Sequence, residues 1–226
     1  MGIWTALFST KKPEARPPAL DQLRVQVFRT DCIAIRALAK NRDAFAIRPL
    51  ADGLVEAIVE HCGDGERVLR WDVIRVFGKP DGELFELARA RAAAETNDVE
   101  KLDLDGGVQV FVSNNFYLSA LMLDSFARNQ HAHGVLFAPL SWHHWCAHVI
   151  QRATVAPTVA LVELLARSVG EQMHVGDVEA LTGDLYWYKP NGEIERLELV
   201  GAGADRHATS PQLEQAIDDA WRAVTR

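Results

Sequence analysis

Hydrophobic and polar positions recur along the chain with two different periods, and the changes of period divide the first hundred residues into expected strands and helices. Alternation at every second residue predicts strands over residues 23–29, 33–38 and 44–48. Apolar positions at helical spacing predict helices over residues 50–62 and 80–95, the second with Pro80 in its first turn. Between these two helices, residues 67–77 form a mixed apolar segment that favours a strand and a turn ending at Gly78.

The second half of the chain is dominated by hairpin patterns. Hairpins are predicted over residues 99–113, 131–150 and 185–200, with turns at Asp105-Gly, at a proline-containing break and at Lys189-Pro-Asn-Gly. Helices are predicted from Asn114 or Asn115 to about Gln130, from Pro157 onward, and from Ser210-Pro211 to near the end of the chain. Residues 201–208 read as a loop. Short mixed groups without regular βαβ alternation predict an α+β fold, with a mixed or antiparallel sheet of several hairpins and about five packed helices.

The first residues differ in pattern from the rest. Residues 1–8 form a short apolar head, and the basic, proline-rich stretch over 9–19 is typical of a linker. The head could dock on a partner or make weak contact with a membrane surface, or it could pack on its own domain. The expected organisation is therefore a head plus linker over 1–19 and a single α+β globular domain over 20–226.

Charge and cysteine usage indicate which partners and which cellular compartment the sequence favours. The formal net charge of −7 argues against a nucleic-acid-binding surface, and it suits either a basic protein partner or simple solubility. The 3 cysteines, Cys32, Cys62 and Cys146, form no CxxC pair and no disulfide framework, which favours the cytoplasm. No secretory signal is recognisable, and no apolar run reaches the roughly 18 residues of a transmembrane helix.

Candidate chemistry is concentrated between His131 and Ile150, a stretch that carries five of the chain's 8 histidines. If residues 139–142 form a four-residue turn, His133 faces His148 and Phe137 faces His144. One face of the hairpin would then carry the candidate metal ligands His133, His144, Cys146 and His148, a set suited to zinc. The alternative is a structural or recognition role, because a slip of one residue would send these histidines to opposite faces.

Other catalytic patterns are missing from the sequence. It contains no HExxH, GxSxG or GxxxxGK[ST] motif. Cys146 lies in an apolar strand, where burial raises the pKa of a thiol and makes it a poor nucleophile. The sequence therefore predicts no catalytic residue and, apart from zinc at the hairpin histidines, no cofactor. It favours a non-enzymatic protein without excluding an enzyme.

Four further segments form a recognisable pattern: Gly82-Glu-Leu-Phe-Glu-Leu-Ala-Arg-Ala-Arg, Tyr117-Leu-Ser119, Gly134-Val-Leu-Phe-Ala-Pro139, and Leu185-Tyr-Trp-Tyr with Gly192-Glu-Ile-Glu-Arg-Leu. Together they resemble the bacterial YtpQ-like family of unknown function. The similarity covers about residues 66–200. The chain departs from the family pattern after Pro139, where Leu140-Ser-Trp-His-His replaces the expected polar turn. The resemblance implies an α+β fold and brings no activity and no site residues.

These observations favour a soluble, cytoplasmic, non-enzymatic bacterial module that binds a protein. One version is an immunity-type protein that neutralises a basic toxin through an acidic surface. The alternative is a metal-binding protein or metal-dependent enzyme that uses the His131–His148 hairpin face.

Overall fold

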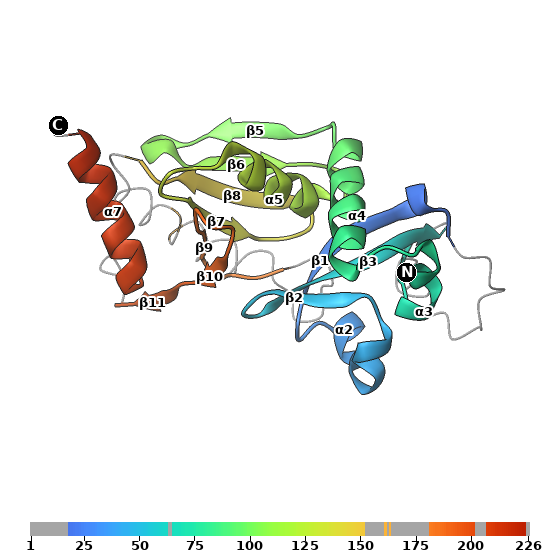
Figure 1. The fold of residues 1–226 in the computed structure, drawn as a ribbon. Helices are drawn as coiled ribbons and strands as arrows, with labels where there is room; N and C mark the ends of the chain where they lie inside the picture. Colours follow the sequence, from blue (N-terminus) through green and yellow to red (C-terminus); the bar gives the residue numbers. More distant parts are fainter. Residues whose placement is uncertain are drawn as a thin grey trace.

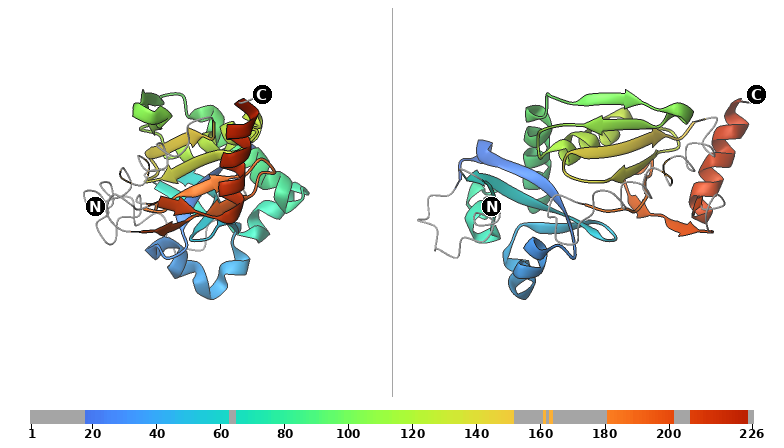
Figure 2. Two further views of the ribbon diagram at one scale, coloured as in Figure 1. Left: turned by 90° about the vertical axis from the view of Figure 1, so that its left-hand side faces the viewer. Right: turned by 180° about the vertical axis from the view of Figure 1, so that it is seen from behind.

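The computed structural model describes residues 18–62, 65–151, 161, 163, 181–201 and 207–224. Two antiparallel sheets lie side by side, with helices α4 and α5 packed against each other where the sheets meet (Figure 1). Helix α7 stands at the opposite end of the molecule from α3 (Figure 2). The predicted α+β class is confirmed, with five α-helices in the described residues.

The first sheet has four strands, and its central strand is β3. Its strands are β1 (Leu23–Arg29), β2 (Ile47–Ala51), β3 (Leu54–Cys62) and β4 (Gly65–Val68). The order is β1-β3-β2, and β4 also pairs with β3. The short helical segments around this sheet are η1 (Leu20–Gln22), α2 (Ile33–Leu38), η2 (Ala39–Ala44), α3 (Trp71–Ile74) and η3 (Arg75–Phe77).

The second sheet has six antiparallel strands in the order β10-β9-β7-β8-β6-β5. Its strands are β5 (Glu100–Asp103), β6 (Gln109–Val112), β7 (Val135–Pro139), β8 (His144–Val149), β9 (Tyr186–Tyr188) and β10 (Ile194–Arg196). The turn η4 (Asp105–Gly107) joins β5 to β6. A separate pair consists of β11 (Glu198–Val200) and β12 (His207–Thr209).

Two of the three longer helices, α5 (Leu118–Asn129) and α7 (Pro211–Val224), cover opposite faces of the second sheet. The third, α4 (Asp81–Glu95), packs against β1 of the first sheet and against α5. Helix α5 packs its buried Leu123 and Phe126 against the face that carries Phe137 and Trp145. Helix α7 contributes buried Leu213 to the cluster on the opposite face. Alternation along the strands therefore produces a core on each side of the sheet.

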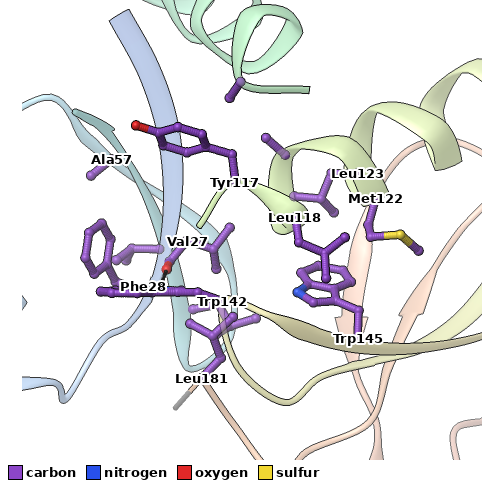
Figure 3. Packing of buried hydrophobic residues seen from close by; sticks show 14 of the residues in the cluster. Val27, Phe28, Ala57, Tyr117, Leu118, Met122, Leu123, Trp142, Trp145 and Leu181 are labelled. Atoms are coloured by element: carbon purple, nitrogen blue, oxygen red, sulfur yellow. Dashed lines mark hydrogen bonds between the residues drawn. The ribbon is translucent and has the colours of Figure 1, made fainter. Parts of the chain in front are cut away.

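Trp142 connects the two sheets through the largest core cluster. It lies in the turn between β7 and β8 and is buried against β1, where its Nε1 donates a hydrogen bond to the carbonyl of Val27 at 2.8 Å. Its ring meets that of Phe28 edge-on, with the centroids 5.6 Å apart (Figure 3). Phe116 makes a second edge-on contact with it at 5.9 Å. Because β1 is an edge strand, this bond satisfies a backbone carbonyl that β3 does not reach.

Several predicted elements are confirmed, and others are wrong. The hairpins over 99–113 and 131–150, the strand over 23–29, and the helices over 80–95 and 211–224 are present. Residues 33–38 form helix α2 instead of a strand, and residues 54–62 form strand β3 instead of a helix. Of the predicted loop over 201–208, His207 and Ala208 belong to β12. Of the helix predicted from Pro157, only Leu161 and Glu163 are described, both in helical conformation, and the apolar head over 1–8 lies outside the described residues.

Candidate functional site

The predicted histidine hairpin is present, but its register differs from the expected one. Val135 faces Val149, and Ala138 faces Cys146. Pro139 stays in β7, and the turn is centred on Trp142, with the Leu140 amide donating to the carbonyl of His144 at 3.0 Å. The register is therefore shifted by three residues, an odd number, so the predicted pairing of His133 with His148 is wrong.

The four candidate ligands are consequently distributed differently from the prediction. His144, Cys146 and His148 follow one another on one face of β8, whereas His133 precedes β7. Val135 and Phe137, which were expected beside them, lie on the other face with Trp145. Among the described residues, no three His, Cys, Asp or Glu side chains are placed to share a metal ion. A metal-dependent function of this hairpin stays a prediction that this geometry does not favour.

The histidines of the hairpin contact the surrounding backbone and hydroxyl groups. His148 is buried, and its Nδ1 lies 3.0 Å from the carbonyl of Gly107. His143 Nδ1 lies 2.9 Å from the carbonyl of Ser113, and His144 Nδ1 lies 3.1 Å from the hydroxyl of Ser141. Burial lowers the pKa of His148 and of His144, which favours the neutral rings. Each of these three histidines thus contributes to the packing of the turns around β8.

Cys146 lies deep in the same strand and shows the inert behaviour expected of a buried thiol. It is 1% exposed, and burial raises its pKa to about 12. A thiol with that pKa is almost entirely protonated at neutral pH, so it offers neither a nucleophile nor a ready metal ligand.

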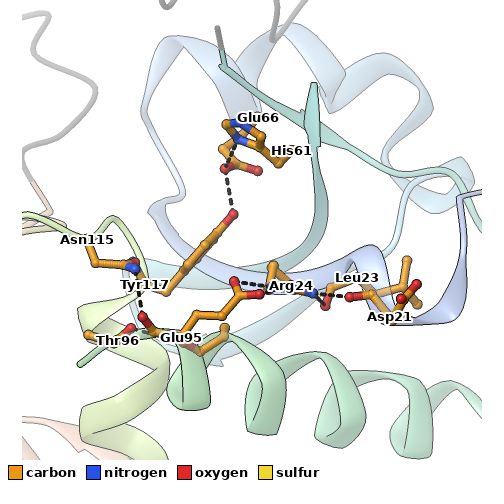
Figure 4. Close-up of polar contacts among 10 residues, drawn as sticks. Asp21, Leu23, Arg24, His61, Glu66, Glu95, Thr96, Asn115 and Tyr117 are labelled. Atoms are coloured by element: carbon orange, nitrogen blue, oxygen red, sulfur yellow. Dashed lines mark hydrogen bonds and ion pairs between the residues drawn. The ribbon is translucent and has the colours of Figure 1, made fainter. Parts of the chain in front are cut away.

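A second polar cluster, missed by the sequence analysis, joins the β3–β4 hairpin to the start of α5 (Figure 4). The hydroxyl of Tyr117 donates to Glu66 Oε1 at 2.6 Å, and His61 Nδ1 lies 3.3 Å from the same oxygen. Among the described residues Glu66 Oε2 is buried without a partner, and burial raises the pKa of the carboxyl group. Nearby, Arg24 of β1 pairs with Glu95 at the end of α4. Glu66 is therefore a buried acid whose proton is held more tightly in the folded protein.

Strand β5 forms an accessible edge of the second sheet. In the described part of the chain β5 pairs only with β6, and it lies at the uncovered margin of the six-stranded sheet (Figures 1 and 2). All four residues of β5 are exposed. Leu102 is 54% and Leu104 42% exposed, and alternation places both on the face of the sheet that carries Val110.

The backbone of β5 has hydrogen-bonding groups directed away from the sheet. The Leu104 amide donates to the carbonyl of Val108 at 2.7 Å, so Leu104 and Leu102 direct their backbone groups toward β6. The N–H and C=O groups of Lys101 and Asp103 then point outward, as at any sheet edge. The sequence predicted this hairpin, but a hairpin pattern alone does not show which strand will lie at the edge.

Within the described residues, every helix is too short or too polar to cross a membrane. Comparison of the chain with models of protein families, with curated proteins and with solved structures finds no match, so the resemblance to the YtpQ-like family stays a prediction.

Proposed function

We propose that this protein is a protein-binding module whose β5 edge takes up an extended segment of a partner as an additional strand. The observation that carries the proposal is the edge itself, with two leucines exposed on one face and outward backbone groups at Lys101 and Asp103. Main-chain hydrogen bonds would provide affinity, and the leucines would contact apolar side chains at alternate positions of the partner.

The charge of this edge indicates the chemistry of the partner. Residues 98–105 include four carboxylates, at Asp98, Glu100, Asp103 and Asp105, and a single cation, Lys101. Lys101 Nζ lies 3.5 Å from Asp103 Oδ1, and Asp98 accepts hydrogen bonds from the Ser113 hydroxyl and the Asn114 amide. With four carboxylates and one lysine, the segment keeps a formal net charge of −3. An acidic edge attracts a segment in which Lys or Arg alternates with apolar residues. A bacterial immunity-type protein that neutralises a basic toxin is one version of this function.

Charges on an edge strand also protect a protein against self-association, so the experiment must separate protection from binding. Asp103→Pro removes an outward N–H without affecting a bond to β6, and proline is tolerated at such a position. Asp103→Ala is the matched control, because it removes the same carboxylate and its contacts with Lys101 and Gln109 but keeps the N–H.

The protein is screened against a displayed library of random linear peptides, and selected peptides are titrated against each variant. We expect the selected peptides to alternate basic and apolar residues and to bind the wild type and Asp103→Ala similarly. Binding to Asp103→Pro is expected to weaken on the order of tenfold, because one main-chain hydrogen bond is lost. Failure to select any peptide, or equal binding by the proline and alanine variants, would refute the proposal.

A further inference from the structure

A cavity of about 630 Å³ lies where β2 of the first sheet approaches β10 of the second. Its charged lining comes from three separate parts of the chain: Arg48 of β2 and Glu56 of β3, Arg89 of α4, and Lys189, Glu193 and Glu195 of the β9–β10 hairpin. Leu50, Leu123 and Ile194 add apolar surface. A concave site that combines apolar walls with a few convergent charges is typical of small-molecule binding.

Two arginines converge on one buried carboxylate inside this cavity. Arg48 lies directly opposite Glu56 in the β2–β3 register, and its Nε donates to Glu56 Oε1. Arg89 Nη2 donates to both oxygens of Glu56, at 2.8 and 2.7 Å. Glu56 is only 1% exposed. One carboxylate balances one guanidinium, so this cluster carries one uncompensated positive charge.

The arginines are also held in place and retain unused donors. The guanidinium of Arg48 lies over the ring of Phe85, 4.1 Å from the centroid, and Arg89 follows Phe85 by one helical turn on the same face of α4. Within the described residues Glu56 engages only one nitrogen of each guanidinium, and Arg89 Nε is buried without a partner. A guanidinium has five N–H donors, so several remain to bind an oxyanion.

The lysine of the cavity is already engaged by carboxylates. Lys189 Nζ lies 2.8 Å from Glu195 and 3.8 Å from Glu193, so this end of the cavity carries two carboxylates against one ammonium group and is net negative. Electrostatic attraction for an anion is therefore concentrated at Arg48 and Arg89, beside the apolar surface of Leu50 and Leu123. We propose that the cavity binds a small organic anion, with its carboxylate or phosphate on the two arginines and its apolar body along these leucines.

Calorimetric titration with hexanoate, hexyl phosphate, inorganic phosphate and 1-hexanol tests the proposal and distinguishes the two oxyanions. We expect saturable binding of hexanoate, hexyl phosphate or both, weaker binding of inorganic phosphate, and none of the uncharged alcohol. Arg89→Gln and Arg48→Gln should each weaken binding about tenfold or more, as expected for a charge-assisted hydrogen bond. Arg70→Gln is the matched control, because Arg70 is exposed, pairs with Asp72 and does not line this cavity.

Glu56→Gln provides a readout that a purely structural cluster would not produce. Removing the carboxylate charge while keeping the shape of the side chain leaves two positive charges, so the variant should bind the anion several-fold more tightly. Circular dichroism and unfolding of each variant establish that it is folded under the titration conditions. Absence of saturable anion binding to the wild type by about 10 mM, binding of 1-hexanol equal to that of hexanoate, or unchanged affinity in both arginine variants would overturn the proposal.

Discussion

Gly134, which precedes β7, allows a sharp test of how the central hairpin packs against β9. Its φ is +85°, a left-handed conformation that favours glycine. A Cβ added there would lie 2.3 Å from the carbonyl oxygen of Tyr188 and 2.5 Å from Nε1 of Trp187. Trp187 Nε1 also donates to the carbonyl of His133 at 3.0 Å, so the chain and the indole ring are held close together at this point. Gly134→Ala must therefore displace β9 or break this bond.

The expected loss of stability has two parts. The left-handed backbone costs a non-glycine residue about 1–2 kcal/mol. Contact with a backbone oxygen at that distance forces a shift in a packed core, which costs about 1–3 kcal/mol more. The total expected for Gly134→Ala is therefore about 2–5 kcal/mol. Gly78→Ala is the matched control, because Gly78 has a φ of +65° and no atom within 4 Å of the added Cβ. We expect this control to cost only the backbone part, about 1 kcal/mol.

Urea unfolding followed by circular dichroism measures both free energies, provided that the two variants and the wild type share one m value. A difference between the variants of about 1 kcal/mol or more supports the close approach at Gly134. The reasoning is refuted if the two substitutions cost the same, because the steric contribution would then be absent.

Three further predictions follow from buried titratable groups. Burial raises the pKa of Glu66 in the folded state, so its contribution to stability is greatest at low pH and is lost as the pH rises through that pKa. The free energy of unfolding of Glu66→Gln, measured between about pH 7 and pH 4.5, should lack this pH dependence. Burial lowers the pKa of His148, so its contribution to stability is present above about pH 6.5 and is lost as the pH falls further. In the same unfolding measurement, His148→Asn should make the free energy of unfolding less dependent on pH in this range. In a variant with Cys32 and Cys62 replaced by serine, Cys146 should react with a disulfide reagent about a thousandfold more slowly in the folded protein than in urea. The reason is its pKa of about 12, which suppresses the thiolate in the folded protein. Comparable reaction rates in the two states would contradict the burial of Cys146.

Local signals were sufficient where an element is specified by its own residues. Ser210 was recognised as the cap of the last helix, and its hydroxyl accepts a hydrogen bond from the amide of Leu213 at 3.1 Å. The turn after Leu104 was identified from Asp105-Gly, and Gly106 has a φ of +77° there. In both cases the decisive interaction lies within a few residues of the signal, so no knowledge of the tertiary structure is needed.

Local signals failed where tertiary packing decides the outcome. Apolar residues at helical spacing, among them Leu54 and Ile58, predict a helix where the structure has strand β3. Arg48 and Arg89 make the buried carboxylate of Glu56 acceptable in this central strand. Helix α2 was expected to be a strand because Ile33 and Ile35 alternate with other residues. In the structure Ile35 is buried beside Ala34, whereas Ile33 is 54% exposed. Alternation in so short a segment does not distinguish a half-buried strand from about one and a half turns of helix.

The candidate sites were harder to predict than the elements, because each depends on a register or on distant partners. Trp142 packs on the open edge of β1 and bonds to Val27, 115 residues earlier in the chain. This contact places Trp142 at the centre of the turn, and the position of the turn fixes the faces on which the histidines lie. In the cavity, Glu56 meets Arg48 and Arg89 across 8 and 33 residues, with no motif linking the three. Sequence analysis can show that a charged residue inside an apolar segment is unusual, but only the fold identifies the residues that neutralise its charge. An unexplained acidic residue inside an apolar run is therefore a useful indication that cations from other elements converge there, and that a ligand site can form around them.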